Sequence, residues 1–418
     1  MKARATIVTL LLACGSTPLD QPDASDAASD ASKEAVGDGP GDVINESNTA
    51  VDTFQCGTIV PTGSTSTTYQ INARHDGVQP SDTVALPLCK RWTRPFAGPM
   101  SYPVVADGRV FVTVADFEGG QGSNVYALDE QTGANLWGPV SLDSEHNWSA
   151  LTYDAGRLFA LDQRGMLTAF EPATGKIVWQ TLTPSYASSA PTAWGGRVYF
   201  SAGVVYAIDQ FDGTLAWSQP ISGTDSSPTV DITGVYASFA CDETYSFDPS
   251  TGSRNWFHSG PCEGGGLSTA ALHSKTVFIR DYFGNLMLAA SSGVALASFY
   301  SGPWNIEIPS FIGDDTLLRV ENGSMDAWNF VQQSTVWTFA GDGKLSTPAV
   351  VASSTVIVGS SAGVVYALDA ADGTLLSSDD AGAAVISNEG GGEYGMTTSM
   401  AVADGRLFVT TKNGLVAY

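Results

Sequence analysis

A hairpin pattern that recurs about every 40 residues constrains the fold of this chain more than any other feature. Each good copy alternates apolar and polar residues, reaches an acidic residue and turns through Gly, and all but the copy that ends at Ser377 close on an aromatic residue. An acidic cap and a Gly that accepts positive φ are typical of a tight turn between two strands. The copies are residues 124–137, 167–179, 204–217, 244–256 and 364–377, with weaker ones at 286–297 and 325–337.

The period and the strand content together predict a β-propeller. A second hairpin precedes several copies, at residues 101–114, 189–202 and 346–360, so each repeat supplies four short strands. Repeats of about 40 residues with four strands are typical of propeller blades. We therefore expect an all-β fold of four-stranded antiparallel blades.

The two ends of the chain predict how the ring closes. The last repeat ends at Tyr418 after only three strands, and the segment 88–96 carries Trp92 some 45 residues before Trp137. We expect this N-terminal strand to complete the last blade, which gives eight blades and removes the free sheet edges of an open array. The closing aromatic residues are expected to dock one blade on the next rather than to bind ligand; they are Trp92, Trp137, Trp179, Trp217, Trp256 and Trp337.

The segments before the repeats differ sharply in composition. Residues 1–14 combine Lys2, Arg4 and a short apolar run that ends in a lipobox, so we expect a lipoprotein signal peptide with Cys14 as the lipidated residue. Residues 15–53 are rich in Asp, Ala and Ser, which predicts a disordered acidic spacer. Residues 54–87 form a lead-in bounded by cysteines, and residues 88–418 form the propeller.

The cysteines other than Cys14 are Cys56, Cys89, Cys241 and Cys262. An exported chain meets an oxidising compartment, so we expect these four to form two disulfides. Three connectivities are possible, and the most economical joins Cys56 to Cys89 and Cys241 to Cys262.

Charge and motif spacing exclude several functions. A net charge of −24 with 19 Lys and Arg residues argues against nucleic-acid binding. The chain has no zinc-type histidine spacing and no nucleophile elbow, and turn aspartates such as Asp129 and Asp209 are expected to cap their own turns rather than hold cations. Carboxylates on different blades remain candidates for glycoside chemistry, namely Glu145, Glu243, Glu263, Glu307 and Asp314. Loop aromatics are candidates for partner contact, namely Trp148, Trp194, Trp304 and Tyr394.

The repeated motif A-x-D-x-x-T/D-G-x-x-x-W resembles that of the pyrroloquinoline-quinone (PQQ)-like eight-bladed propellers. It is best matched by Ala127, Asp129, Gly133 and Trp137, and by Ala207, Asp209, Gly213 and Trp217. The resemblance implies two functional branches. Quinoprotein dehydrogenases hold PQQ between a tryptophan and a vicinal disulfide, with calcium beside it, but this chain has no adjacent cysteines. The other branch contains non-catalytic lipoproteins similar to the outer-membrane assembly factor BamB.

The sequence therefore favours a non-catalytic, lipid-anchored, extracytoplasmic propeller that binds a protein partner at the bacterial cell envelope. We expect a monomeric ring that needs no cofactor and no metal and touches the membrane only through its lipid. Two alternatives stay open. One is a quinoprotein-type oxidoreductase that uses PQQ and calcium, and the other is a propeller that binds or cleaves carbohydrate.

Overall fold

The computed structural model describes residues 56–116, 122–142, 146–224, 226–239, 243–261, 269–280, 285–300, 307–389 and 396–418. Residues 54–418 form one compact unit. All the elements in the described ranges are β-strands, and none of those ranges contains a helix that is long and apolar enough to span a bilayer. The expectations for residues 1–14, Cys14 and the spacer 15–53 lie outside the described residues.

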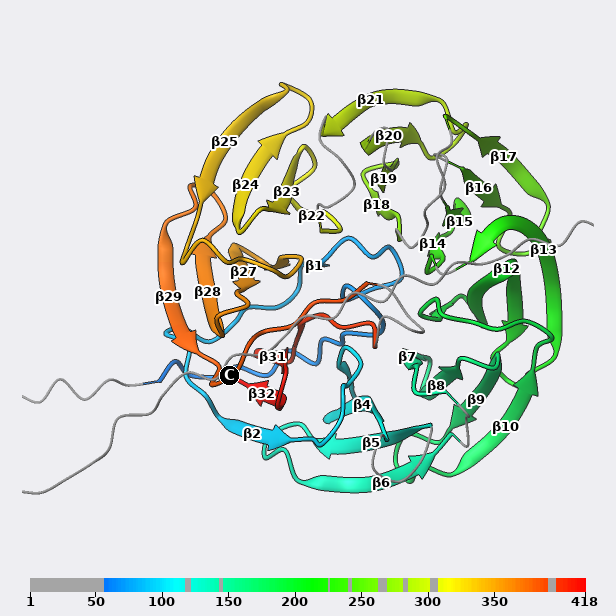
Figure 1. The fold of residues 1–418 in the computed structure, drawn as a ribbon, viewed down its shortest axis with the longest axis horizontal. Coiled ribbons are helices and arrows are strands. Elements are labelled where there is room, and N and C mark those ends of the chain that lie inside the picture. The colour runs from blue at the N-terminus through cyan, green and yellow to red at the C-terminus, as the bar shows by residue number, and fades with distance from the viewer. Residues whose placement is uncertain are drawn as a thin grey trace, which may run out of the picture. The chain divides into compact units, whose positions relative to one another are not determined.

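The strands form eight blades arranged around a ring (Figure 1), which confirms the predicted propeller. Blade 1 contains β3 (Val104–Ala106), β4 (Arg109–Ala115), β5 (Ser123–Asp129) and β6 (Asn135–Ser141). Blade 2 contains β7 (Ser149–Asp154), β8 (Arg157–Asp162), β9 (Met166–Phe170) and β10 (Ile177–Leu182). Blade 3 contains β11 (Thr192–Trp194), β12 (Arg197–Asp209) and β13 (Leu215–Thr224). The long β12 covers both central strand positions of its blade.

The remaining blades follow the same order from the ring centre outwards. Blade 4 contains β14 (Thr229–Asp231), β15 (Gly234–Ser238), β16 (Thr244–Phe247) and β17 (Arg254–His258). Blade 5 contains β18 (Ala271–His273), β19 (Thr276–Arg280), β20 (Asn285–Ala289) and β21 (Ala295–Tyr300). Blade 6 contains β22 (Ser310–Ile312), β23 (Thr316–Glu321), β24 (Ser324–Asn329) and β25 (Ser334–Phe339). Blade 7 contains β26 (Val350–Ala352), β27 (Thr355–Gly359), β28 (Val364–Asp369) and β29 (Leu375–Asp380).

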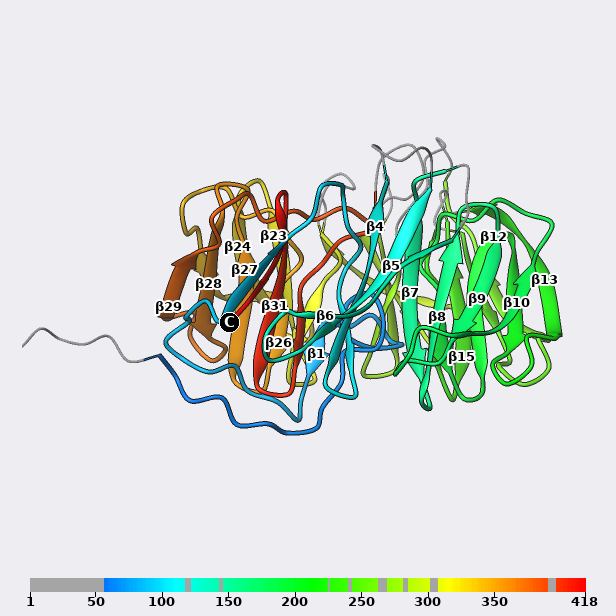
Figure 2. The ribbon, with the colours of Figure 1, turned by 90° about the horizontal axis from the view of Figure 1, so that it is seen from below.

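Blade 8 closes the ring as predicted, with strands from both ends of the described chain. Its inner strands are β30 (Ala401–Ala403), β31 (Arg406–Thr411) and β32 (Gly414–Ala417), and its outermost strand is β2 (Trp92–Pro95). The β2 strand runs antiparallel to β32, with Trp92 opposite Ala417 and Pro95 opposite Gly414. Figure 2, a side view, shows that strands such as β8, β9 and β10 run roughly parallel to the ring axis.

Inner and outer strands differ because they have different surroundings. The central strand β4 is buried along almost its whole length, whereas the outermost strand β6 alternates between exposed and partly buried residues. A central strand is covered by the neighbouring blades on both faces and therefore reads as a continuous apolar run. The outermost strand faces solvent with its edge, so it keeps polar residues and the periodicity of two.

Six of the eight blade interfaces use the same tryptophan contact. The indole of each closing Trp lies against the turn Gly of the next blade, where an added Cβ would approach the ring to between 2.4 and 2.7 Å. The indole Nε1 also donates a hydrogen bond to a backbone carbonyl oxygen of the same turn, as from Trp137 to Pro172 at 2.8 Å. The Trp and Gly pairs are Trp92 with Gly133, Trp137 with Gly175, Trp179 with Gly213, Trp217 with Gly252, Trp256 with Gly293, and Trp337 with Gly373.

The two other interfaces lack both halves of this contact. Between blades 5 and 6, Ala297 occupies the Trp position, and the turn has Gln333 at φ 53° where the other turns have Gly. Between blades 7 and 8, Ser377 occupies the Trp position, and its Oγ accepts a hydrogen bond from the backbone N–H of Leu88 at 2.9 Å. Blade 8 has no turn at that point, because its outermost strand comes from the other end of the chain.

A double-mutant cycle tests the Trp137 and Gly175 contact. We expect Trp137→Ala to lower the free energy of unfolding by about 3 kcal/mol and Gly175→Ala by about 2 kcal/mol. The double variant should lose at least 1 kcal/mol less than the sum, since removing the indole removes the clash. The free energy of unfolding of all three variants is measured by urea denaturation. Gly156→Ala is the control, because Gly156 also has a positive φ but its Cβ would meet no atom within 4 Å. Strict additivity would contradict this interpretation.

Candidate functional site at the centre of the ring

The lead-in segment of residues 66–79, here called the hub segment, lies inside the ring and pairs with the innermost strands (Figure 1). Its carbonyl oxygens accept hydrogen bonds from backbone N–H groups on successive blades. The donors belong to blades 1, 2, 4, 5 and 7, and they are Val105, Tyr153, Val230, Leu272 and Val351, at 2.8 to 2.9 Å. The short strand β1 (Val78–Gln79) runs parallel to β26 as part of this pairing.

The hub segment also reaches the remaining blades. Thr68 Oγ1 donates to the Pro191 carbonyl oxygen of blade 3 at 2.9 Å. Gly77 lies against Ser310 of blade 6, and Gln79 Nε2 donates to the Val402 carbonyl oxygen of blade 8 at 3.3 Å. One short segment therefore contacts all eight blades and covers inner strand edges that would otherwise leave backbone groups unpaired.

Two buried titratable residues hold the hub segment in place. His75 is fully buried, with Nδ1 2.7 Å from the Tyr69 carbonyl oxygen and Nε2 3.1 Å from Thr192 Oγ1. Burial lowers the pKa of His75, which favours the neutral ring. Asp76 accepts a hydrogen bond from Asn72 Nδ2 at 2.7 Å, and its Oδ2 lies 3.0 Å from Arg74 Nε.

The pKa of Asp76 is lowered although its carboxylate is buried. Burial by itself raises the pKa of this group, but the nearby His273 and the charge of Arg74 outweigh it. His273 Nδ1 lies 3.6 Å from Asp76 Oδ2. The hub segment is thus held beside blade 5 by the contact of the buried Asp76 with His273 as well as by its backbone.

A second segment, residues 384–389, extends towards blade 5 from the chain that precedes blade 8. Its backbone is fixed beside β31 by the hydrogen bond from Ile386 N to Thr410 O at 3.2 Å. Its Glu389 carboxylate meets Arg280 at the end of β19, with Nη2 2.6 Å from both carboxylate oxygens. The two side chains are only 4% and 13% exposed, so this pair joins segments 109 residues apart in a largely dry environment.

Glu307 adds a second carboxylate to this group. Its Oε2 accepts a hydrogen bond from Ser387 Oγ at 3.3 Å, and its backbone N–H donates to Val320 O at 3.2 Å. Burial raises the pKa of Glu307 to about 7; the charge of Arg280 opposes this shift and that of Glu389 adds to it. The pKa of the buried Tyr69 hydroxyl is also raised, first by burial and then by the charge of Glu389.

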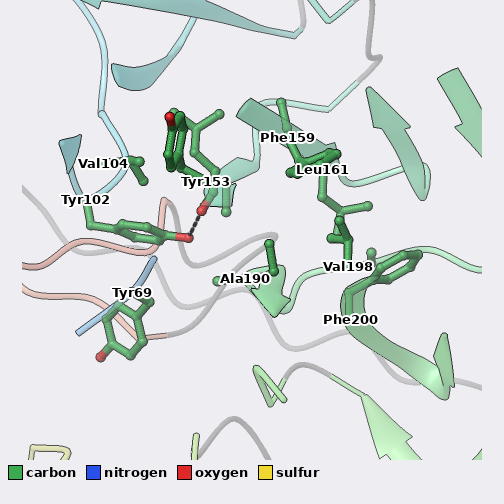
Figure 3. Close-up of a cluster of buried hydrophobic side chains, with 14 of the residues drawn as sticks. Tyr69, Tyr102, Val104, Tyr153, Phe159, Leu161, Ala190, Val198 and Phe200 are labelled. Atoms are coloured by element: carbon green, nitrogen blue, oxygen red, sulfur yellow. Dashed lines mark hydrogen bonds between the residues drawn. The ribbon is translucent and has the colours of Figure 1, made fainter. Parts of the chain in front are cut away.

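Aromatic side chains fill the space beneath these charged groups. Tyr69 and Tyr102 are 0% and 1% exposed, and their rings lie 5.7 Å apart between centroids. Figure 3 shows them side by side near the apolar residues of blades 2 and 3, with the Tyr102 hydroxyl directed at a backbone oxygen, that of Leu151. The Tyr69 hydroxyl has no hydrogen-bond partner within the described residues.

The residues at the centre do not fit the quinone site of the dehydrogenase branch. That site needs a vicinal disulfide as one face of a sandwich, and no two of the chain's five cysteines are adjacent. The hub segment, Tyr69 and Tyr102 occupy the centre instead. Among the described residues, no group of three or more His, Cys, Asp or Glu side chains could hold a metal ion. We derive no redox step from this arrangement.

The residues that the sequence singled out lie in different parts of the structure. Cys56 and Cys89 form a disulfide with Cα atoms 5.6 Å apart, while Cys241 and Cys262 lie outside the described residues. Trp148 is 1% exposed, so the expectation that it contacts a partner is wrong. Trp194 packs partly buried against blade 4, and Trp304 and Tyr394 lie outside the described ranges, as do Glu145 and Glu263.

Among the candidate carboxylates that the structure describes, only Glu307 lies in the central group. Glu243 accepts a hydrogen bond from Tyr245 on blade 4, and Asp314 accepts one from Ser274 in an exposed contact. The partners of Glu307, namely Arg280, Glu389 and Tyr69, were not singled out from the sequence. A lone Arg at a strand end and a Glu in a Gly-rich insert give no local signal, because only ring closure brings them together.

Comparison with known proteins gives a consistent family. The family model described as "Outer membrane protein assembly factor BamB" matches residues 121–302 and 321–418. A curated protein of that name from Moranella endobia is 24% identical over 246 residues, which are 54% of this chain and 61% of the relative. The chain thus spans about three fifths of the length of this relative.

Solved structures share the fold at low identity. BamB from Moraxella catarrhalis is 17% identical with a TM-score of 0.56, and the match covers 79% of this chain and 96% of the other. Quinohemoprotein alcohol dehydrogenase from Comamonas testosteroni is 15% identical with a TM-score of 0.64, over 86% of this chain and 78% of the other. At these identities the likeness shows the fold alone.

Asp76→Asn tests how the hub segment is held. We expect a loss of about 3 kcal/mol in the free energy of unfolding at pH 7, since Arg74 and His273 would lose a buried partner. Because the pKa of Asp76 is lowered, this stabilisation exists above its usual pKa and disappears as the pH falls through the folded value. Asp209→Asn is the control, as the natural Asn329 caps the equivalent turn. Equal losses of unfolding free energy in Asp76→Asn and Asp209→Asn would contradict the role given to Asp76 in holding the hub segment.

Glu307→Gln tests the raised pKa of Glu307. The pKa of Glu307 is about 7 in the folded protein, against an ordinary value of 4.5. The protonated carboxyl therefore stabilises the fold at low pH, and this stabilisation is lost as the pH rises through 7. We expect the variant to unfold at a temperature a few degrees above wild type at pH 8, corresponding to about 1–3 kcal/mol, and at an equal temperature at pH 4.5. The exposed Glu171→Gln should shift neither value. If the unfolding temperatures of Glu307→Gln and wild type differ by the same amount at all pH values, the raised pKa of Glu307 is disproved.

Proposed function

This chain belongs to the family of the outer membrane protein assembly factor BamB, and we propose that it is a non-catalytic β-propeller that binds protein partners in outer-membrane assembly. It would act as a monomeric ring on the periplasmic side of the outer membrane of a bacterium, anchored only by a lipid on Cys14. The observation that carries the proposal is that the chain's own hub segment lies inside the ring and pairs with the innermost strands, while the chain has no adjacent cysteines for a quinone sandwich.

With the centre filled, the loops and the outer rim are left as surfaces for partners. The outermost strands expose aliphatic side chains at equivalent positions around the ring. They are Leu136, Val178, Leu296, Val336 and Leu376, each one residue before the closing position of its blade and more than 40% exposed. Exposed apolar residues of this kind on successive edge strands are typical of surfaces that meet other proteins.

The test is made in the bacterium that carries the chain. We expect its deletion to lower the amount of β-barrel protein in the outer membrane, and plasmid-borne wild type to restore it. A Cys14→Ser variant should restore it poorly, because an unanchored ring loses its high local concentration at the membrane. Cross-linking followed by mass spectrometry should recover outer-membrane assembly proteins. Unchanged outer-membrane protein levels together with no such cross-link would overturn the proposal.

A biochemical test addresses the quinoprotein alternative. Purified protein is incubated with PQQ and calcium, and reduction of an artificial electron acceptor by primary alcohols is followed by absorbance. We expect no reduction above the rate of free PQQ, since Tyr69 and Tyr102 occupy the ring centre. Calcium-dependent reduction that requires the protein would replace the scaffold function with catalysis.

A further inference from the structure

A cavity of about 470 Å³ opens between blades 5 and 6. Tyr300 of β21 contributes one side, and strands β23, β24 and β25 of blade 6 contribute the rest. The residues that matter for its chemistry are Tyr300, Arg319, Glu321, Met325, Asp326 and Phe339. The volume lies within the range of small-ligand sites and is ample for one long side chain. We call it the seam pocket.

The seam pocket lies at an interface without the tryptophan contact. Ala297 replaces the closing Trp, and Gln333 replaces the turn Gly. Blade 6 supplies aromatic side chains of its own, with Phe330 5.4 Å from Phe278 of blade 5 between ring centroids. The cavity thus opens at an interface that lacks the indole contact, although neither Ala297 nor Gln333 lines the cavity itself.

Arg319 does not offer a free positive charge to the pocket. Its Nε donates to Asp326 Oδ1 at 3.0 Å, its Nη2 donates to Asp326 Oδ2, and its Nη1 donates to the Phe299 carbonyl oxygen at 2.8 Å. The guanidinium also lies 4.8 Å from the centroid of the Trp328 ring. Its charge is thus balanced by Asp326, so an anion would gain little here.

Glu321 is the carboxylate in the pocket that lacks a cationic partner. Its Oε1 accepts hydrogen bonds from the Tyr300 hydroxyl and from Asn322 Nδ2, the latter at 2.9 Å. Neither donor carries a charge, and within the described residues Oε2 has no hydrogen-bond partner. Burial and the bond to Glu321 raise the pKa of Tyr300 to about 12, so the phenol stays a donor that orients the carboxylate.

The remaining wall is mostly apolar, with Ser324 and Thr338 as its polar residues. Met325 is 2% exposed, and Phe339 packs edge-on against Tyr366 with ring centroids 5.2 Å apart. A single carboxylate beside aromatic and thioether surface complements a group that has a cationic head and an apolar stem. Arginine and lysine side chains have this form, and a net charge of −24 would attract basic segments to the surface.

We propose that the seam pocket binds the guanidinium or ammonium group of a basic side chain on a partner polypeptide, with Glu321 as the charge partner. The proposal rests on the protein-binding function proposed above and names the chemistry that one of its contacts would recognise. Tyr300 and Phe339 would cover the stem of the side chain, and the head would pair with Oε2 of Glu321.

The test uses the full-length protein and two capped pentapeptides, Gly-Gly-Arg-Gly-Gly and the same peptide with uncharged citrulline in place of arginine. Binding is followed by NMR on the side-chain amide of Asn322, which lies beside the site. We expect a Kd on the order of 1 mM for the arginine peptide, as suits a single side chain. The citrulline peptide should bind at least tenfold more weakly, and salt should weaken the arginine peptide.

Variants assign the binding to the pocket. Glu321→Gln should weaken the arginine peptide at least fivefold, and Thr338→Arg, which places a tethered guanidinium at the pocket wall, should also weaken it. Glu171→Gln on blade 2 should bind as wild type does. Equal binding of both peptides, no binding at 10 mM, or an unaffected Glu321→Gln variant would overturn the proposal.

A cross-linking comparison separates this proposal from the function on which it rests. If the scaffold function is correct and the pocket is not used, wild type and Glu321→Gln will capture envelope partners equally. If the scaffold function is wrong, wild type will capture none, whereas the arginine peptide can still bind. If Glu321→Gln captures fewer envelope partners than wild type and unfolds at the same temperature, the result supports both the scaffold function and the use of the seam pocket.

Discussion

The structure depends on the pairing of the hub segment with the innermost strands of the blades. Closing the ring leaves no blade at an open end of the array, but each blade still presents the edge of its first strand to the centre. Those backbone groups need partners once water is excluded. Here a single extended segment supplies carbonyl oxygens to blade after blade, from Val105 to Val351. Because it reaches every blade, its position couples blades that do not touch one another.

Contacts around the rim complement this central pairing. Each indole covers the turn of the next blade, and only Gly there leaves room for the ring and accepts positive φ. The residues at the Trp and Gly positions consequently change together. Ala297 is matched by Gln333, and Ser377 faces the point where two chain segments share a blade. The interface between blades 5 and 6, which lacks the indole, also contains the cavity that Glu321 and Tyr300 line, at the other end of blade 6 from Gln333.

Charge is distributed differently at the centre and at the surface. At the centre, Arg280 is balanced by Glu389 and Asp76 by Arg74, as burial requires. Glu307 is the additional carboxylate of that group, and its pKa responds by rising. The pair of Arg280 and Glu389 joins segments 109 residues apart, which suits a rigid ring more than a catalytic site. A filled and rigid centre agrees with a protein whose function resides on its loops and rim.

The sequence by itself determined the repeat, the four strands per blade, the closure by Trp92 and the turn chemistry. These are local patterns, because period, turn residues and strand alternation are all written within about 40 residues. It also favoured the pairing of Cys56 with Cys89 among the possible connectivities. The function of residues 66–79 and the meeting of Arg280, Glu307 and Glu389 were decided only by tertiary structure. Closing a ring brings together residues more than a hundred positions apart, and no local pattern encodes which of them will meet at its centre.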